Sequence, residues 1–307
     1  MKDKQKISIK LAIIAVFLAA LTGGGNPVFV KIALQEIPIF TFNFLRFFIS
    51  LLLILPLFLR EKPKITKDIY KLILLSLLPV VNITLFAFGV RLTTATTGQM
   101  IYAAVPIVAG VLSYLFLSER FGINKILGIF LGFVGTMIII LLPVLGEPSD
   151  IKGNLWGNIV IFTAMLSWAA YTVFSKKFHT RYSPIYLNTC FILTAAVIQF
   201  FPALSEFSSD NVWWQHVSAN SIFAVFYVSA LGTVATYIFY QYAIKHGTPI
   251  IASMSLYIQP IATFSLASII LGEILTLGFI IGSILIFFGT WRVTKGSKSS
   301  AIATNTK

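Results

Sequence analysis

Charged residues are scarce in this sequence, at 11% of 307 residues. A soluble domain of this size would carry roughly 25%, so an ordinary soluble globular protein is excluded. Acidic residues are the rarer kind, with 10 Asp and Glu against 23 Lys and Arg and a net charge of +13. The basic residues lie between apolar runs and not in one patch, which argues against a nucleic-acid partner.

Catalytic and metal-binding motifs are also lacking. The single cysteine, Cys190, cannot form an internal disulfide and fits no metal or redox motif. There is no HExxH, GxSxG, P-loop or GxGxxG sequence. No Asp or Glu lies deep in an apolar run, and we expect His179, His216 and His246 to lie in loops. We therefore expect no enzyme activity, no cofactor and no metal site.

Apolar runs of about 20 residues, each long enough to cross a bilayer as a helix, recur along the whole chain. They do not alternate apolar and polar residues as the strands of a membrane barrel do. The sequence therefore predicts an all-α integral membrane protein with the lipid bilayer as a partner. Its ten transmembrane helices are expected at residues 11–31, 38–59, 71–90, 95–117, 122–143, 155–175, 184–204, 220–243, 249–271 and 275–294.

The distribution of Lys and Arg predicts the orientation, because cytoplasmic loops carry an excess of both residues. If both termini are cytoplasmic, 19 basic residues fall in cytoplasmic segments and three, Lys31, Arg91 and Lys152, fall outside. An odd number of helices would scramble this division. We therefore expect a multi-pass protein of the cell (plasma) membrane with both ends in the cytoplasm.

One pattern occurs twice in the sequence: a proline followed thirteen residues later by a glutamate. The copies are Pro106 to Glu119 and Pro260 to Glu273, and an offset of 154 also pairs Met100 with Met254 and Gly135 with Gly289. An offset of 145 overlays residues 22–31 on 167–176. Each repeat thus has five helices, and because five is odd the second repeat is inverted in the membrane.

These repeats divide the chain into five parts. We expect a cytoplasmic N-terminal tail at 1–10, a first repeat at 11–143, an external linker at 144–154 and a second repeat at 155–294. Residues 295–307 are small and polar and are expected to form a mobile cytoplasmic tail.

The sequence resembles the drug/metabolite transporter superfamily, specifically its ten-helix EamA branch, over residues 10 to 294. The matching features are Lys31 and Lys176 at the ends of helices 1 and 6, Arg46 in helix 2, the SWAAYTVFSKK and ALGTVATY stretches, and the doubled Pro-to-Glu block. One position departs from the family pattern, because helix 1 has Gly23 where the family usually carries tryptophan. We therefore expect the helix 1 side of the cavity to be shaped differently.

Arg46 is the one charged residue well inside a predicted span. Eight residues from Pro38 place it roughly 12 Å deep, where an unpaired charge is costly. Its guanidinium would either attract a carboxylate or phosphate of the substrate or be a structural group bonded to carbonyls and Asn43. The sequence leaves both interpretations open.

Polar and aromatic residues at helical spacing occur in several spans, and we expect them to face inward because polar groups in lipid are costly. They would either line a substrate cavity or bond helix to helix. The candidate substrate-binding residues are Asn26, Asn43, Arg46, Gln99, Tyr102, Trp168, Tyr171, Asn188, Tyr237, Gln241, Tyr257 and Gln259.

Other residues are candidates for hinge or structural roles. Gly24, Pro27, Pro106 and Pro260 would loosen or bend their helices, as pivots or as static kinks. Glu119 and Glu273 are expected to interact with the positive end of the helix that follows each of them. Lys31 and Lys176 suit helix C-termini. Glycines in helices 5 and 10 permit close contact, either within the chain or across a homodimer.

The sequence thus predicts a secondary transporter that uses alternating access between the two repeats. The family resemblance implies small organic metabolites, such as amino acids, related compounds or amphipathic drugs, often in the export direction. The alternatives are a non-transporting sensor or assembly partner and a lipid flippase or scramblase. Without a deep carboxylate, proton coupling would need a tyrosine, Arg46 or a glutamate at the membrane edge, so a facilitator or exchanger is credible.

Overall fold

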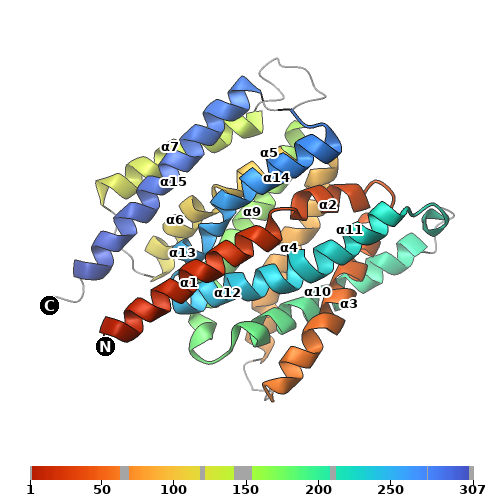
Figure 1. Cartoon of the computed structure of the whole chain (residues 1–307), viewed down its shortest axis with the longest axis horizontal. Helices are drawn as coiled ribbons and strands as arrows, with labels where there is room; N and C mark the ends of the chain where they lie inside the picture. The colour runs from red at the N-terminus through yellow and green to blue at the C-terminus, as the bar shows by residue number, and fades with distance from the viewer. Residues whose placement is uncertain are drawn as a thin grey trace.

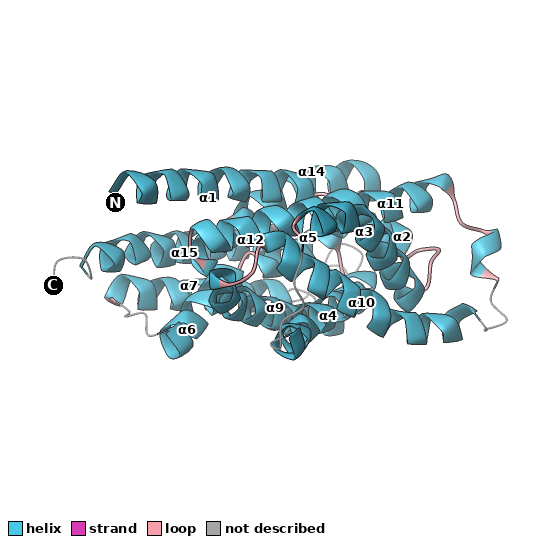
Figure 2. Ribbon diagram, turned by 90° about the horizontal axis from the view of Figure 1, so that it is seen from below, coloured by secondary structure: helices cyan, strands magenta, loops and turns pink. Residues whose placement is uncertain are grey.

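The computed structural model describes residues 2–62, 69–117, 122–141, 154–207, 212–274 and 276–303. Throughout these residues the regular elements are helices (Figures 1 and 2). The α-helices are α1 (Lys2–Gly23), α2 (Asn26–Ala33), α3 (Ile39–Arg60), α4 (Ile69–Leu92), α5 (Ala95–Tyr102), α6 (Val105–Leu117), α7 (Ile123–Leu141), α9 (Leu155–Ser175), α10 (Pro184–Phe207), α11 (Ala219–Ser229), α12 (Thr236–His246), α13 (Pro249–Ser253), α14 (Ser255–Leu271) and α15 (Leu277–Ala303).

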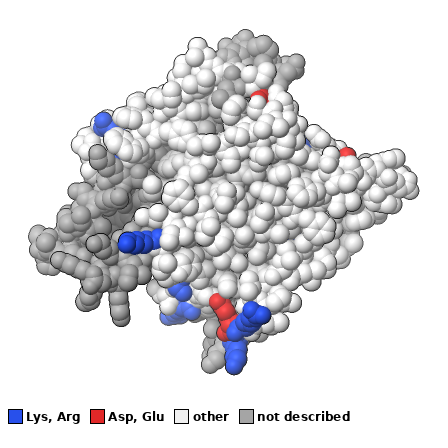
Figure 3. Space-filling view, in the orientation of Figure 1, with Lys and Arg blue, Asp and Glu red and all other residues white. Residues whose placement is uncertain are grey.

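Eight helical segments of the described chain are long and apolar enough to span a membrane, and 126–141 and 277–289 are shorter apolar helices. Together they correspond to the ten predicted segments. Many large apolar side chains on these helices are exposed, as lipid-facing residues must be. On the face shown in Figure 3 the surface is mostly uncharged, and the charged atoms lie mainly near its margins. The protein is a multi-pass helical membrane protein.

The duplication is visible in the packing of α7 against α15, the fifth helices of the two repeats. A Cβ atom added to Gly135 would lie 2.6 Å from the carbonyl oxygen of Gly282, and one added to Gly289 would lie 2.5 Å from that of Gly128. Gly128 is equivalent to Gly282, and Gly135 to Gly289, so the two contacts are reciprocal. Such a contact is the signature of two-fold symmetry, and it shows that these glycines pack within the chain.

Three spans are interrupted, and a fourth changes its helix type. Helix 1 breaks between α1 and α2, helix 4 breaks at Ala103 and Ala104, and helix 9 breaks at Met254. In helix 8, residues Ala230–Ala235 form a π-helix between α11 and α12. Such π segments are frequent at functional sites. The breaks divide helices 1, 4 and 9 into two helical segments each.

The first and last helices extend beyond the predicted spans, and two of the three histidines do not lie in loops. Residues 295–303, expected to be a mobile tail, continue α15, and residues 2–10 belong to α1. His179 lies in a 3₁₀-helix, Lys176–Thr180, and is buried, while His246 is the last residue of α12. Only His216 follows the expectation of a loop.

Candidate functional site

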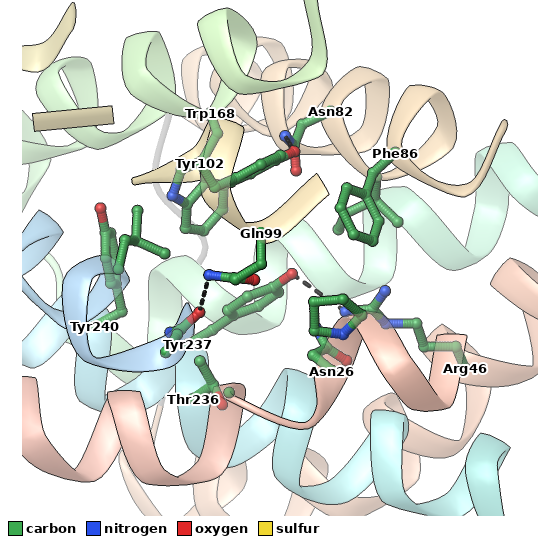
Figure 4. A pocket seen from close by; sticks show the side chains of 15 residues that line it. Asn26, Arg46, Asn82, Phe86, Gln99, Tyr102, Trp168, Thr236, Tyr237 and Tyr240 are labelled. Atoms are coloured by element: carbon green, nitrogen blue, oxygen red, sulfur yellow. Dashed lines mark hydrogen bonds between the residues drawn. The ribbon is translucent and has the colours of Figure 1, made fainter. Parts of the chain in front are cut away.

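Helices from both repeats enclose a cavity of about 70 Å³ near the breaks in helices 1, 4 and 9. Figure 4 shows side chains converging on it from several helices. One guanidinium, four amide side chains and five aromatic rings are among its lining groups. The lining residues are Gly23, Asn26, Pro27, Arg46, Asn82, Ile83, Phe86, Gln99, Tyr102, Trp168, Thr236, Tyr237, Tyr240, Leu256 and Gln259.

Arg46 reaches this cavity from α3 and is 2% exposed. Its Nε donates to the hydroxyl of Thr233 at 2.7 Å, and its Nη2 donates to the hydroxyl of Tyr237 at 3.2 Å (Figure 4 shows the second bond). Both acceptors belong to helix 8, in the other repeat. The structural interpretation of Arg46 supposed bonds to Asn43 and to backbone carbonyls. The guanidinium instead bonds these two hydroxyls.

The π-helix explains why Thr233 can accept this bond. Its own hydroxyl donates to the carbonyl oxygen of Val228, five residues earlier, at 2.8 Å. The same i−5 bond recurs from Thr236 to Leu231 at 2.7 Å. Because each hydroxyl proton is used within helix 8, the Thr233 oxygen presents only lone pairs to the guanidinium.

The arginine bonds use two of the five N–H groups of a guanidinium. The two partners are neutral hydroxyls, and no other residue lining the cavity is charged. A positive charge so deep in a protein normally has an anionic partner. The remaining N–H groups can therefore receive an anion that enters the cavity.

A pair of amides joins the repeats on another side of the cavity. Gln99 Nε2 donates to Gln259 Oε1 at 3.0 Å. A Cβ atom added to Gly23 would lie 2.8 Å from Gln259 Nε2, so Gln259 occupies the space where a larger side chain at position 23 would begin. Gly23 thus leaves room for the Gln259 side chain on the helix 1 side of the cavity, and the expected difference in shape from other family members stays a prediction.

Aromatic rings form the rest of the wall. The ring of Trp168 lies 5.4 Å from that of Tyr237 and 5.2 Å from that of Tyr240. Phe86 lies edge-on to Tyr102 at 5.4 Å. Aromatic pairs at such distances pack favourably, and together these rings form an apolar wall that also carries the hydroxyl groups of the tyrosines.

The structure brings eight of the predicted site and hinge residues into this cavity: Asn26, Pro27, Arg46, Gln99, Tyr102, Trp168, Tyr237 and Gln259. Five predicted substrate-binding residues do not line it: Asn43, Tyr171, Asn188, Gln241 and Tyr257. The first four are buried, as predicted for inward-facing groups. Gln241 Oε1 lies 2.8 Å from Nε2 of His179, beyond the cavity. Helical periodicity identified the inward face of each helix but not the depth along it.

Asn82 and Phe86 also line the cavity, although neither was among the candidate residues, and so does Tyr240, from the inward polar and aromatic face of helix 8. Asn82 Nδ2 donates to the carbonyl oxygen of Ala164 at 2.7 Å and also bonds the hydroxyl of Tyr102. An asparagine within an apolar run was a usable signal, because a buried amide needs hydrogen-bond partners. Phe86 carried no such signal among many lipid-facing phenylalanines.

The candidate hinge residues lie near the breaks, with one exception. Pro27 is in the first turn of α2 and Pro106 in the first turn of α6, where a missing N–H is tolerated. Gly24 precedes α2, and its carbonyl oxygen accepts a bond from Thr263 Oγ1 at 2.5 Å. Pro260 lies inside α14, beyond the break at Met254. Their roles as pivots stay a prediction.

The four residues with predicted structural roles differ in what they bind. Glu273 binds a helix N-terminus, but that of α5 in the other repeat and not that of the helix that follows it. Lys31 lies 3.5 Å from Glu273 Oε1. Lys176 donates to carbonyl oxygens at the end of α12. Glu119 lies outside the described residues. No cluster of three metal-ligating side chains occurs within the described ranges.

The fold and the cavity define a class of protein: a membrane protein built of two inverted helical repeats with a polar cavity at their junction, as in transporters. The profile of the EamA-like transporter family matches residues 10–141 and 155–294. The chain belongs to this family, and it is a transporter of the EamA type.

Individual relatives agree with this assignment. The chain is 28% identical over 313 residues to the uncharacterized transporter YvbV of Bacillus subtilis, with 99% of each chain covered. It is 28% identical over 270 residues to a WAT1-related protein of Arabidopsis thaliana, covering 78% of this chain and 72% of the relative. A crystal structure with 15% identity superposes with a TM-score of 0.68 over 92% of this chain and 96% of the other, which shows the shared fold.

Proposed function

We propose that this protein moves a small organic metabolite bearing an anionic group across the plasma membrane, by alternating access between its two repeats. Amino acids, related carboxylates and amphipathic drugs with an acidic group belong to this class, and export is the proposed direction. The observation that carries the proposal is the buried guanidinium of Arg46, which reaches a cavity at the repeat junction and bonds only neutral hydroxyls.

The electrostatics of the cavity favour an anion. A guanidinium and a carboxylate or phosphate form strong, directional pairs, and the pair gains further from the low dielectric of a site this buried. None of the lining residues is acidic, so no protein group competes for Arg46. The amides and aromatic rings on the other walls suit the uncharged remainder of an amphipathic solute.

The cavity volume supports movement of the repeats. At about 70 Å³ the space is well below the roughly 300–1,000 Å³ of ordinary ligand pockets. A metabolite therefore requires the walls to separate. Since the walls come from both repeats and Arg46 is bonded across them, separation of the repeats both opens the cavity and releases Arg46 hydrogen-bond donors to the substrate.

Burial of the polar groups favours a soluble substrate over a lipid. A flippase or scramblase needs a polar groove open laterally to the bilayer. Here Arg46, Gln99 and Gln259 are each at most 5% exposed. The family membership likewise favours transport over a sensor or assembly role.

A binding assay tests the proposal. Thermal shifts of the purified protein with amino acids, organic acids, nucleosides and cationic dyes should reveal a ligand with an acidic group. Arg46→Gln should weaken that ligand by about tenfold to a hundredfold, since hydrogen bonds to charged groups contribute about 1.5–3 kcal/mol. Arg91→Gln, at an exposed arginine, is the control and should bind normally.

Counterflow in proteoliposomes then tests transport of the same ligand. Arg46→Gln should lower the rate strongly, and Arg46→Lys should retain part of it. Folded Arg46→Gln and Arg46→Ala variants with parental binding and rates would contradict the proposal. Because no carboxylate of the sequence lies deep in a span, we propose exchange or facilitated transport, and a rate that requires an imposed pH gradient would overturn that part.

A further inference from the structure

Glu273 ties the second repeat to the first at one end of the bundle. Its carboxylate accepts from the backbone N–H of Ala95 at 2.7 Å and from that of Thr96 at 2.9 Å, in the first turn of α5. Lys31, at the end of α2, lies 3.5 Å from Glu273 and also donates to the carbonyl oxygen of Thr93 at 2.7 Å. The Glu273 side chain is 8% exposed, so these charge-assisted bonds are shielded from water.

Two other glutamates make the same kind of contact beside it. Glu206 of α10 accepts from the backbone N–H of Thr41 at 2.6 Å and from that of Phe40 at 3.2 Å, in the first turn of α3. Glu36, between α2 and α3, accepts from the N–H of Ser218 at 2.7 Å, at the start of α11. Each carboxylate satisfies helix N–H groups that have no partner within their own helix. Each one also crosses from one repeat to the other.

The contacts of Glu273 and Lys31 lie at the end of the bundle where α2 ends and α5 begins. Both are half-helices of 8 residues, and each contributes cavity-lining residues. Asn26 precedes Lys31 by five residues and Gln99 follows Ala95 by four, so the contacts lie about 6–8 Å along the helices from the cavity. The other ends of α2 and α5 meet the breaks in helices 1 and 4.

We propose that Glu36, Glu206 and Glu273 form a latch between the repeats, and that α2 and α5 are the gate that this latch holds closed. The inference rests on the proposed alternating-access function, since a gate must open for substrate to pass. With both termini cytoplasmic, the gate faces the outside of the cell. Opening it requires the three carboxylates to leave the helix N-termini together, and the breaks in helices 1 and 4 let the half-helices turn without unfolding the spans.

Among the described residues, the glutamate contact at the opposite end is of another kind. At the opposite end, Glu61 accepts from the hydroxyl of Ser183 across the repeats, at an exposed site. That contact involves a side-chain hydroxyl and not the N–H groups of a helix. Glu61 therefore supplies a matched control: a glutamate that also bridges the repeats, but away from the proposed gate.

External labelling of a cysteine placed in the cavity tests the latch. The parent carries Cys190→Ser and the reporter Leu256→Cys, whose position lines the cavity. A membrane-impermeant thiol reagent is added outside right-side-out vesicles, and its rate of reaction is measured in Glu273→Gln, Glu273→Ala, the double variant Glu206→Ala/Glu273→Ala, and Glu61→Gln. Size-exclusion chromatography establishes folding of each variant, and the near-isosteric Glu273→Gln guards against loss of the fold.

We expect Glu273→Ala to label about tenfold faster than the parent, because it loses two charge-assisted bonds and the contact with Lys31. The double variant should label faster still, Glu273→Gln should be intermediate, and Glu61→Gln should not be faster. The latch is refuted if the folded double variant and Glu273→Gln both label at the parental rate, or if Glu61→Gln accelerates labelling equally. Counterflow on the same variants separates the latch from the proposed transport function. If Glu273→Ala labels faster but the protein transports none of the ligands that it binds, the proposed function is refuted and the latch is not.

Discussion

Lys31 and Lys176 occupy equivalent positions in the two repeats, yet their partners among the described residues differ. Both donate to an equivalent carbonyl oxygen, that of Thr93 at 2.7 Å for Lys31 and that of Gly247 at 2.7 Å for Lys176. Lys176 also donates to Ile244 at 2.6 Å within its own repeat, whereas Lys31 pairs with Glu273 of the other repeat. A contact inside one repeat survives when the repeats move, and a contact between them does not.

The helices that carry these lysines also differ, because one is continuous and the other is broken. Residues 167–176 lie in continuous helix up to Ser175, while the equivalent residues 22–31 break between α1 and α2. Three consecutive glycines stand in the first repeat where Trp168, Ala169 and Ala170 stand in the second. Glycine disfavours the helix interior and alanine favours it. The break in its helix and the contacts of the described residues make the Lys31 end better suited to move and the Lys176 end better suited to stay fixed.

The largest effect on stability is expected at the fixed end. Lys176→Met leaves the carbonyl oxygens of Ile244 and Gly247 without their charged donor, and we expect the free energy of unfolding to fall by about 3 kcal/mol. Lys31→Met should cost less, about 2 kcal/mol, because it removes a single bond to a carbonyl oxygen, that of Thr93, and an ion pair whose lysine is 24% exposed. Denaturant unfolding in detergent measures both. A larger loss from Lys31→Met than from Lys176→Met would contradict the assignment of the two ends.

A smaller effect is expected where helix 1 breaks. A Cβ atom on Gly24 would lie 2.6 Å from Cβ of Ala262, so Gly24→Ala should push α14 away and cost about 2 kcal/mol. Ala262→Gly should restore part of the loss in the double variant, although the new glycine weakens α14 by about 1 kcal/mol. The equivalent change in the second repeat, Ala169→Gly, is the control and should cost about 1 kcal/mol. If the two changes in the free energy of unfolding simply add in the double variant, the contact with Ala262 is not what excludes a side chain at position 24.

The smallest effect is a dependence on pH at the gate. The N–H of Ser218 and then the hydroxyl of Ser221 lower the pKa of Glu36 below its ordinary value of 4.5. The Glu36 contact should therefore contribute fully above pH 4.5 and be lost as the pH falls through the lowered pKa of the folded protein. Between about pH 5 and pH 3 the parent should lose slightly more stability than Glu36→Gln. Thermal unfolding measures both losses. If the parent and Glu36→Gln lose the same stability, the Glu36 carboxylate does not hold Ser218.

The broad architecture was predictable from the sequence because it depends on run lengths and on the duplication. Apolar runs of membrane-spanning length predicted the helices, and the equivalence of Gly135 and Gly289 predicted the symmetry that their reciprocal contacts now show. The burial of Arg46 followed from the same physics, since a charge in a span must avoid lipid.

The depth of each residue along its helix was not predictable in this way. Asn43 and Asn188 face inward as predicted but lie away from the cavity, because periodicity reports the face of a helix and not its position relative to neighbouring helices. Glu273 was expected to interact with the helix that follows it, and its binding to α5 depends on a contact between residues 178 positions apart. Long-range contacts of this kind leave no local pattern.

Distance measurements between spin labels test the central claim, that the Lys31 end opens when the latch is broken. One pair of labels, at Gln35 and Asn220, spans the gate between the repeats, and a second pair, at Arg60 and Lys177, spans the other end; all four side chains are exposed. In a Cys190→Ser background, Glu273→Ala should lengthen or broaden the distances between positions 35 and 220 and should not lengthen those between 60 and 177. Unchanged distances across the gate, together with longer ones at the opposite end, would contradict the account.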